Sequence, residues 1–241
     1  MTTAAEQKDQ KEQKAPVNQR YWRQLDILPP ERLADVHFTV VGAGAIGSWA
    51  VLTLAKMGAQ HISVWDDDRV DEHNVSNQLY GPDEIGNAKV HALADWLYPL
   101  TGVNLANHDL RVEKGRALVF SPRTVLVAAV DNMETRKLLW EIAKTSPSVQ
   151  LFVDPRMGGE VLRLYAVRPT DPQHQEFYEA NLYGSKDAEQ LPCTAQSIIY
   201  TAQFAGAFIA SVVASFLRGG DYAKETVFDC RSFRIISSTE V

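Results

Sequence analysis

The stretch "VVGAGAIGSW", from Val40 to Trp49, carries three glycines in the spacing Gly-x-Gly-x-x-Gly between an apolar run and a helix-like segment. In a Rossmann-type fold this spacing marks the turn from the first strand to the first helix, where backbone amides face a phosphate. Gly42 permits the tight turn, Gly44 lets a ligand approach the backbone, and Gly47 allows the helix to pack closely on the strand. The stretch therefore predicts a nucleotide-binding loop without identifying the nucleotide.

An alternation of strands and helices continues from this loop. Short, β-branched apolar runs predict strands at 36–44, 61–68, 102–110, 124–132 and 149–156, and helical apolar spacing predicts helices at 45–59, 87–100 and 133–146. This order is typical of a Rossmann-like α/β fold, with a mainly parallel sheet and helices on both faces. Later segments predict antiparallel C-terminal strands at 159–167 and 226–236, a long polar loop at 169–194 and a buried helix at 195–217.

Composition limits the class of protein. The chain of 241 residues suits one sizeable domain, so we expect a disordered N-terminal arm at 1–19 and a single domain at 20–241. The net charge of -6 makes nucleic acid an unlikely partner, and no apolar run looks long enough to span a membrane. The two cysteines, Cys193 and Cys230, form no Cys-x-x-Cys pair, so we expect no zinc site. These features predict a soluble cytoplasmic protein.

Charged residues after the glycine loop extend the predicted site. Asp66 lies 24 residues past Gly42 at the end of the second predicted strand, where an acid binds ribose hydroxyls. Lys89 begins a helix whose N-terminus favours phosphate, although a solvated surface lysine is the alternative. Asp131 follows a central strand, at the edge where open α/β sheets bind ligands, although it could instead cap the next helix. Up to this point NAD fits as well as ATP.

The two cysteines have different predicted roles. Cys193 precedes the long helix at 195–217, and a thiol at a helix N-terminus becomes a better nucleophile. It could also be a small, buried and inert side chain, and both interpretations stay open. Cys230 lies in a predicted strand and is expected to be structural.

Six segments, taken together and in this order, resemble the ThiF/MoeB family of adenylating enzymes that activate ubiquitin-like proteins. They are "RYWRQ" (20–24), "GAGAIGS" (42–48), "DDDRVDEHNVSNQ" (66–78), "GNAK" (86–89), "VDNMETR" (130–136) and "DPRMGGE" (154–160). The insertion between 65 and 90 has no role in an NAD dehydrogenase. The resemblance covers roughly residues 20–235 and favours ATP as the nucleotide.

The resemblance implies a reaction and a set of roles. Such enzymes bind ATP and Mg²⁺, and the C-terminal carboxylate of a ubiquitin-like protein attacks the α-phosphorus and releases pyrophosphate. The implied catalytic residues are Asp131, which organises Mg²⁺, with Lys89, Cys193 and Arg23, the last acting across a homodimer on the partner's nucleotide. The implied cofactor-binding residues are Gly42, Gly44, Gly47, Asp66, Asp68, Asn74, Asn77, Gln78, Lys89, Asn132 and Arg136.

One departure from the family pattern leaves alternatives open. The family commonly has arginine where this chain has Asn77, and asparagine lacks the charge and the bidentate fork of a guanidinium. Arg20, Arg23 or Arg69 could compensate, or the protein could be a weak or inactive subunit that scaffolds a partner. An NAD-dependent oxidoreductase is a further alternative, and a peptide could replace the ubiquitin-like protein as substrate.

Overall fold

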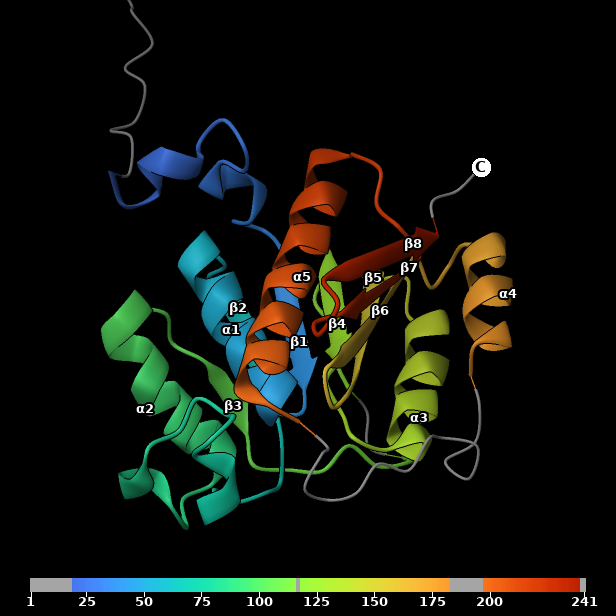
Figure 1. Cartoon of the computed structure of the whole chain (residues 1–241). Helices are drawn as coiled ribbons and strands as arrows, with labels where there is room; N and C mark the ends of the chain where they lie inside the picture. The colour runs from blue at the N-terminus through green and yellow to red at the C-terminus, as the bar shows by residue number, and fades with distance from the viewer. Residues whose placement is uncertain (1–18, 116–117, 183–196, 239–241) are drawn as a thin grey trace, which may run out of the picture.

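The computed structural model describes residues 19–115, 118–182 and 197–238, so most of the predicted arm at 1–19 lies outside it. A single sheet of eight strands, in the order β3-β2-β1-β4-β5-β6-β7-β8, runs through the molecule (Figure 1). The strands are β1 (His37–Val41), β2 (His61–Trp65), β3 (Ala106–His108), β4 (Thr124–Ala128), β5 (Val149–Gly158), β6 (Val161–Val167), β7 (Glu225–Asp229) and β8 (Arg234–Ser238). The helices are α1 (Ala45–Met57), α2 (Lys89–Thr101), α3 (Met133–Lys144), α4 (Pro172–Ala180) and α5 (Ile199–Arg218), with short 3-10 turns η1 (Gln19–Gln24), η2 (Pro30–Arg32), η3 (Glu72–Asn74) and η4 (Pro82–Glu84).

The sheet changes direction at β5. Strands β3, β2, β1, β4 and β5 pair in parallel, and β5, β6, β7 and β8 pair antiparallel. The central strand β4 is buried along its whole length, as expected for an apolar strand covered on both faces. The predicted mainly parallel sheet with antiparallel C-terminal strands is therefore confirmed.

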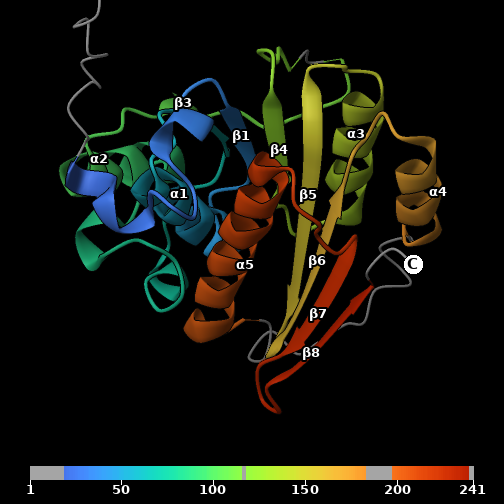
Figure 2. The same cartoon turned by 90° about the horizontal axis from the view of Figure 1, so that it is seen from above.

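Helices cover both faces of the sheet, as predicted. Figure 2 shows α1, α2 and α5 on one face and α3 and α4 on the other. Leu54, Leu93 and Ile209 belong to the core on the first face. Trp140 of α3 and Tyr178 of α4 belong to the core on the second face, where their rings contact each other.

One sequence prediction about a loop is wrong. The stretch predicted as a loop at 169–194 contains α4, because Asp171 caps its N-terminus by accepting hydrogen bonds from the backbone amides of Gln173 and His174, with Pro172 at the first helical position. Residues 183–194 lie outside the described part. Helix α2, predicted at 87–100, ends at Thr101 with Pro99 in its last turn.

The long helix α5 is a core helix. With 20 residues it is the one helix of the described part that is long and apolar enough to cross a membrane, so the expectation that no segment reaches that length is wrong. Small residues lie on its buried side, among them Ala202, Ala205, Gly206 and Ala210. A Cβ on Gly206 would lie 2.9 Å from the backbone of Trp49 in α1. This close approach explains the alanine- and glycine-rich sequence of the helix.

The glycine loop yields a first prediction, on stability. A Cβ at position 47 would lie 1.8 Å from the carbonyl oxygen of Gly42, a backbone atom of the same loop, so Gly47→Ala forces the loop apart. We expect a loss of about 3 kcal/mol, measured by urea unfolding. Gly220→Ala is the control and should change stability little, because the nearest atom beyond the adjacent residues, the carbonyl oxygen of Ser215, would lie 3.5 Å from the new Cβ. Equal stability of the two variants would contradict the tight packing of the loop.

Candidate active site

The glycine loop leaves an open space at the N-terminus of α1. Gly42 has a φ of +99°, and a Cβ there would lie 2.2 Å from the carbonyl oxygen of Ala129, so the loop touches the segment that follows β4. Gly44 caps α1 without a side-chain hydrogen bond, and a Cβ on it would meet nothing within 4 Å. The amides of the first turn therefore face space that an anion can enter.

Asp66 is tied to this loop. Its Oδ2 accepts a hydrogen bond from the Ala43 amide at 2.6 Å, and its Oδ1 accepts one from the Asp68 amide at 2.8 Å. Burial raises the pKa of the Asp66 carboxyl above its usual value, while these two amides oppose the rise. A carboxylate has about four acceptor positions, so Asp66 keeps the capacity to accept a further hydroxyl donor.

Lys89 is buried and faces an acid. Its Nζ lies 2.8 Å from Oδ2 of Asp68, and only 8% of its side chain is exposed. The backbone places the pair, because the Lys89 amide also donates to the carbonyl of Asp68, and Tyr80 donates to the carbonyl of Ala43 in the glycine loop. The structure therefore brings Lys89, Asp68 and the glycine loop into one connected network, and the alternative of a solvated surface lysine is wrong.

The amide residues of the insertion point to the interior. Asn74 is buried, and its Oδ1 accepts a hydrogen bond from the Asp71 amide. Asn77 donates from Nδ2 to the hydroxyl of Ser197 at 2.5 Å. Oδ1 of Asn77 and Oε1 of Gln78 are buried and accept no hydrogen bond from the described residues. These two acceptors leave the insertion with unused hydrogen-bonding capacity.

Asp131 lies at the edge of the sheet that carries the glycine loop. It follows β4 by three residues and is exposed, and its Oδ1 accepts a hydrogen bond from Nδ2 of Asn132 at 3.2 Å. The alternative that Asp131 caps α3 is wrong, because Asn132 is the N-cap and its side chain accepts from the amide of Thr135. The carboxylate of Asp131 is therefore not engaged in capping.

Arg136 lies in the interior, not at the surface of the site. Its Nε donates to Oδ1 of Asp154 at 2.5 Å and its Nη2 donates to the carbonyl of Val130 at 2.6 Å. Only 5% of its side chain is exposed. This position suits support of the strand end. It does not bring the guanidinium to a bound nucleotide, as the cofactor-binding role implied by the resemblance would require.

Arg23 is placed at the opposite end of α1 from the glycine loop. Its segment η1 docks where α1 ends: Gln24 donates to the carbonyl of Met57, and Tyr21 contacts Gly58. A helix of 13 residues separates this end from the loop by about 20 Å. Arg23 is exposed, so within one subunit it does not reach the site.

Two other arginines were candidates to replace the charge missing at Asn77. Arg20 donates to the carbonyl of Thr101 at 2.7 Å, at the C-terminal end of α2. Arg69 pairs through its backbone with Ala88, the residue before Lys89, and 62% of its side chain is exposed. Arg69 is therefore the better placed of the two.

The structure describes one of the two cysteines, Cys230. Cys193 lies outside the described residues. Cys230 follows β7 and is buried, and its amide donates to the carbonyl of Glu160. This environment fits the predicted structural role of Cys230.

Sequence reasoning missed a buried cluster at the middle of β5. Asp154 is fully buried and accepts hydrogen bonds from Arg136, Arg156 and Tyr178. The quoted segment "DPRMGGE" contained two of these residues, and an acid inside an otherwise apolar run was the feature that could have pointed to them.

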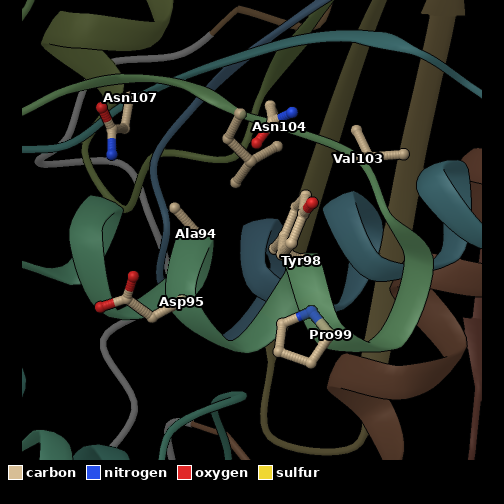
Figure 3. Close-up of a pocket in the computed structure, with 8 residues that line it drawn as sticks. Ala94, Asp95, Tyr98, Pro99, Val103, Asn104 and Asn107 are labelled. Carbon is tan, nitrogen blue, oxygen red and sulfur yellow. The ribbon is translucent and has the colours of Figure 1, made fainter.

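The surface also has a hollow that lies away from the glycine loop. It is formed by the second half of α2 and the chain leading into β3 (Figure 3). Its lining residues include none of the predicted site: Ala94, Asp95, Tyr98, Pro99, Val103, Asn104, Leu105 and Asn107. The hollow is therefore separate from the glycine loop.

Comparisons with solved structures support the fold. The crystal structure of Escherichia coli MccB with AMPCPP and MccA has a TM-score of 0.70 at 15% identity, covering 92% of this chain and 71% of MccB. The structure of PaaA has a TM-score of 0.69 at 18% identity, covering 91% and 72%. These identities are low, so the likeness concerns the fold alone.

Comparisons of sequence are more specific. The sulfur carrier protein adenylyltransferase of Thermus thermophilus is 30% identical over 183 residues, which are 72% of this chain and 61% of that protein. The probable adenylyltransferase/sulfurtransferase MoeZ of Mycobacterium tuberculosis is 33% identical over 135 residues, 52% of this chain and 34% of MoeZ. The chain thus spans about a third of MoeZ and under two thirds of the Thermus protein. Since the model of the ThiF family matches residues 18–236, the chain belongs to the ThiF family.

Proposed function

We propose that this protein adenylates the C-terminal carboxylate of a ubiquitin-like protein or peptide, using ATP and releasing pyrophosphate. The single observation that carries the proposal is the open N-terminus of α1 at Gly44, with Lys89, Asp68 and Asp66 networked around the same loop. Membership of the ThiF family, together with relatives that are adenylyltransferases by name, favours this reaction over hydride transfer to NAD.

The residues present fit a nucleoside triphosphate. The uncapped first turn of α1 supplies amide donors for a phosphate, and the absence of a Cβ at Gly44 lets the phosphate approach them. Asp66 retains acceptor capacity for ribose hydroxyls at the end of β2. A phosphate would compete with Asp68 for the ammonium group of Lys89, because the two now form an ion pair.

The donor set also fits Mg²⁺. This ion is commonly held by one or two carboxylates together with substrate phosphates, and Asp131 offers an exposed carboxylate beside the glycine loop. Bound there, Mg²⁺ would neutralise charge on the phosphates. Asp67 and Asp68, which are also close to Asp66, are engaged with Arg111 and Lys89.

The proposed reaction brings two anions together. A carboxylate oxygen of the substrate tail forms a bond to the α-phosphorus, and the bond from that phosphorus to the bridging oxygen breaks. Pyrophosphate leaves with the electron pair, and an acyl-adenylate remains. The protein's contribution is to orient the two anions and to supply positive charge from Lys89 and the helix amides.

The names of the relatives favour the C-terminal tail of a protein or peptide as the substrate. Relatives are named for a sulfur carrier protein and, in Haloferax volcanii, as a SAMP-activating enzyme E1, and MccB was crystallised with MccA. We extend to this chain the substrate class of a flexible C-terminal tail, acted on by a homodimer.

The second candidate is a catalytically weak subunit that scaffolds a partner. The observation that favours it is Asn77, whose amide is engaged with Ser197 rather than presented as a cation. ATP–pyrophosphate exchange by the purified protein in the presence of a tail substrate distinguishes the two candidates. Exchange supports the enzyme, whereas firm ATP binding without any exchange supports the scaffold.

Gly44→Ala is predicted to weaken ATP binding without unfolding the protein. The φ of Gly44 is ordinary for alanine and a Cβ meets nothing, but it occupies the space proposed for a phosphate. At 100 times the dissociation constant ATP stabilises the wild type by about 2.7 kcal/mol, and a ~100-fold weaker affinity cuts this to about 0.4 kcal/mol. Thermal unfolding with and without ATP and Mg²⁺ measures the difference.

Two comparisons make this test decisive. Gly220→Ala, remote from the loop, should keep the full ATP-dependent shift. NAD in place of ATP should give no shift with the wild type. A shift with NAD alone, or an undiminished ATP shift in Gly44→Ala, would contradict the proposed nucleotide site.

A further inference from the structure

The buried carboxylate of Asp154 joins three elements of the fold. Asp154 lies in β5, and its Oδ1 accepts a hydrogen bond from Nε of Arg136 in α3 at 2.5 Å. Its Oδ2 accepts from Nε of Arg156 at 2.8 Å and from the hydroxyl of Tyr178 in α4 at 2.7 Å. Asp154 and Tyr178 are fully buried, and both arginines are nearly so. Every described polar contact of this carboxylate is thus inside the protein.

The electrostatics of the cluster keep Arg156 and Tyr178 protonated. Burial alone would lower the pKa of Arg156, but the Asp154 carboxylate and the neighbouring Tyr178 and Tyr165 together outweigh burial and hold that pKa above its usual value. Burial, followed by the adjacent carboxylate, raises the pKa of Tyr178 well above its usual value, so its hydroxyl stays a donor. Both side chains therefore remain hydrogen-bond donors to Asp154 at neutral pH.

Arg136 connects the Asp154 cluster to the segment that follows β4 at the edge of the sheet. While Nε is held by Asp154, Nη2 donates to the carbonyl of Val130 at 2.6 Å, and Nη1 lies 3.2 Å from the sulfur of Met133. Val130 immediately precedes Asp131. On the other side of the same segment, the carbonyl of Ala129 lies against Gly42. The backbone that presents Asp131 is therefore held between the glycine loop and Arg136.

We propose that Asp154 is a positioning residue for adenylation: it fixes Arg136, and Arg136 fixes the backbone that presents Asp131 to Mg²⁺. The inference rests on the proposed function, because it assigns Asp154 a role only if Asp131 serves a bound nucleotide. Asp154 itself touches neither ATP nor the tail in this scheme.

Packing energy alone gives no reason for such a cluster. Replacing a buried ion pair by apolar side chains of similar volume is often neutral or stabilising, because desolvation offsets the attraction. The contact between α3 and β5 is already made by apolar side chains, among them Trp140 against Phe152. The apolar contacts do not supply a hydrogen-bond donor for the Val130 carbonyl. Arg136 supplies this donor, and in our proposal it does so only while Asp154 orients the guanidinium.

The test uses Arg136→Lys and Asp154→Asn in the full chain. Lysine keeps the positive charge beside Asp154 but cannot contact Asp154 and Val130 through two separate nitrogens as the guanidinium does. Asp154→Asn removes the charge at equal size and could fail to fold, in which case Arg136→Lys decides alone. Ala143→Gly, a buried change on the same helix α3 away from the cluster, is the matched control for destabilisation.

Two readouts separate positioning from mere stability. The first is the Mg²⁺ concentration that half-saturates the thermal shift produced by a fixed ATP concentration, which needs no turnover. The second is the Mg²⁺ dependence of ATP–pyrophosphate exchange. We expect Arg136→Lys to raise both half-saturating concentrations by ~10-fold or more, as outer-sphere changes do at other metal sites, while Ala143→Gly lowers only the unfolding temperature.

The outcomes distinguish this inference from the function on which it rests. A wild-type protein that shows no Mg²⁺-dependent ATP shift would overturn the proposed function, and the role of Asp154 with it. A normal wild-type shift together with an unchanged Mg²⁺ dependence in folded Arg136→Lys would overturn the positioning role alone. An equal change in Ala143→Gly would do the same, since it would trace the effect to lost stability.

Discussion

Asp131→Ala is expected to abolish ATP–pyrophosphate exchange, lowering its rate by at least ~100-fold, with little change in unfolding temperature. The loss follows from removing the carboxylate proposed to organise Mg²⁺ at the phosphates. Stability is spared because the side chain is exposed and its described hydrogen bond is a 3.2 Å contact from Asn132. Asn132, which caps α3, stays in place.

Asp95→Ala is the matched control for this experiment. Asp95 is an equally exposed acid, but it lines the hollow beside α2, away from the glycine loop (Figure 3). The control should keep the full exchange rate. If Asp131→Ala also kept it while folded, the assignment of Asp131 would be wrong.

The fold was predictable from local patterns of sequence. Strands β1, β2 and β4 are short and β-branched, and the next long helix after each one has apolar spacing. Both patterns can be read in a single sequence because burial on both faces of the sheet requires them. Helix α4 was missed because its sequence is polar and only Asp171-Pro172 marks its start. The side of α4 that faces the core is buried through His174 and Tyr178. Two buried positions are too few to show a helical pattern of apolar residues in the sequence.

The site was predictable in part. The glycine spacing indicated the loop, and the structure adds that Gly42 fits against Ala129 while Gly44 faces open space. The Lys89–Asp68 pair and the Asp154 cluster were not predictable, because each joins segments far apart in the chain. Arg136 meets Asp154 only because β4 and β5 lie side by side in parallel.

The position of Arg23 raises the question of what completes the site. In the described residues near the glycine loop, Asn77 offers no charge, and Lys89 is already paired with Asp68. Arg23 is exposed on η1, next to exposed Trp22, at the far end of α1. An exposed cation beside an exposed aromatic ring suits a contact between subunits, so we propose that Arg23 acts on the partner's nucleotide.

The second large effect is therefore expected from Arg23→Ala, which should lower exchange by ~100-fold or more without destabilising the protein, because the arginine is exposed. A site that takes Asp131 from one subunit and Arg23 from the other can be rebuilt from two inactive proteins. When Arg23→Ala and Asp131→Ala are unfolded, mixed and refolded together, half of the dimers are mixed and each contains one complete site. Exchange should then recover to roughly a quarter of the wild-type rate.

The control for this recovery is a mixture of Lys89→Ala with Asp131→Ala. Both residues lie around the glycine loop of the same subunit, so every site in a mixed dimer lacks one of them and no activity should return. Recovery in the Arg23 mixture alone shows that the arginine acts across the interface. If neither mixture recovers although both refold as dimers, Arg23 does not serve the partner's site. Arg69, beside Ala88 and the nearest cation to Lys89 along the chain, is then the remaining candidate to supply from within the subunit the charge missing at Asn77.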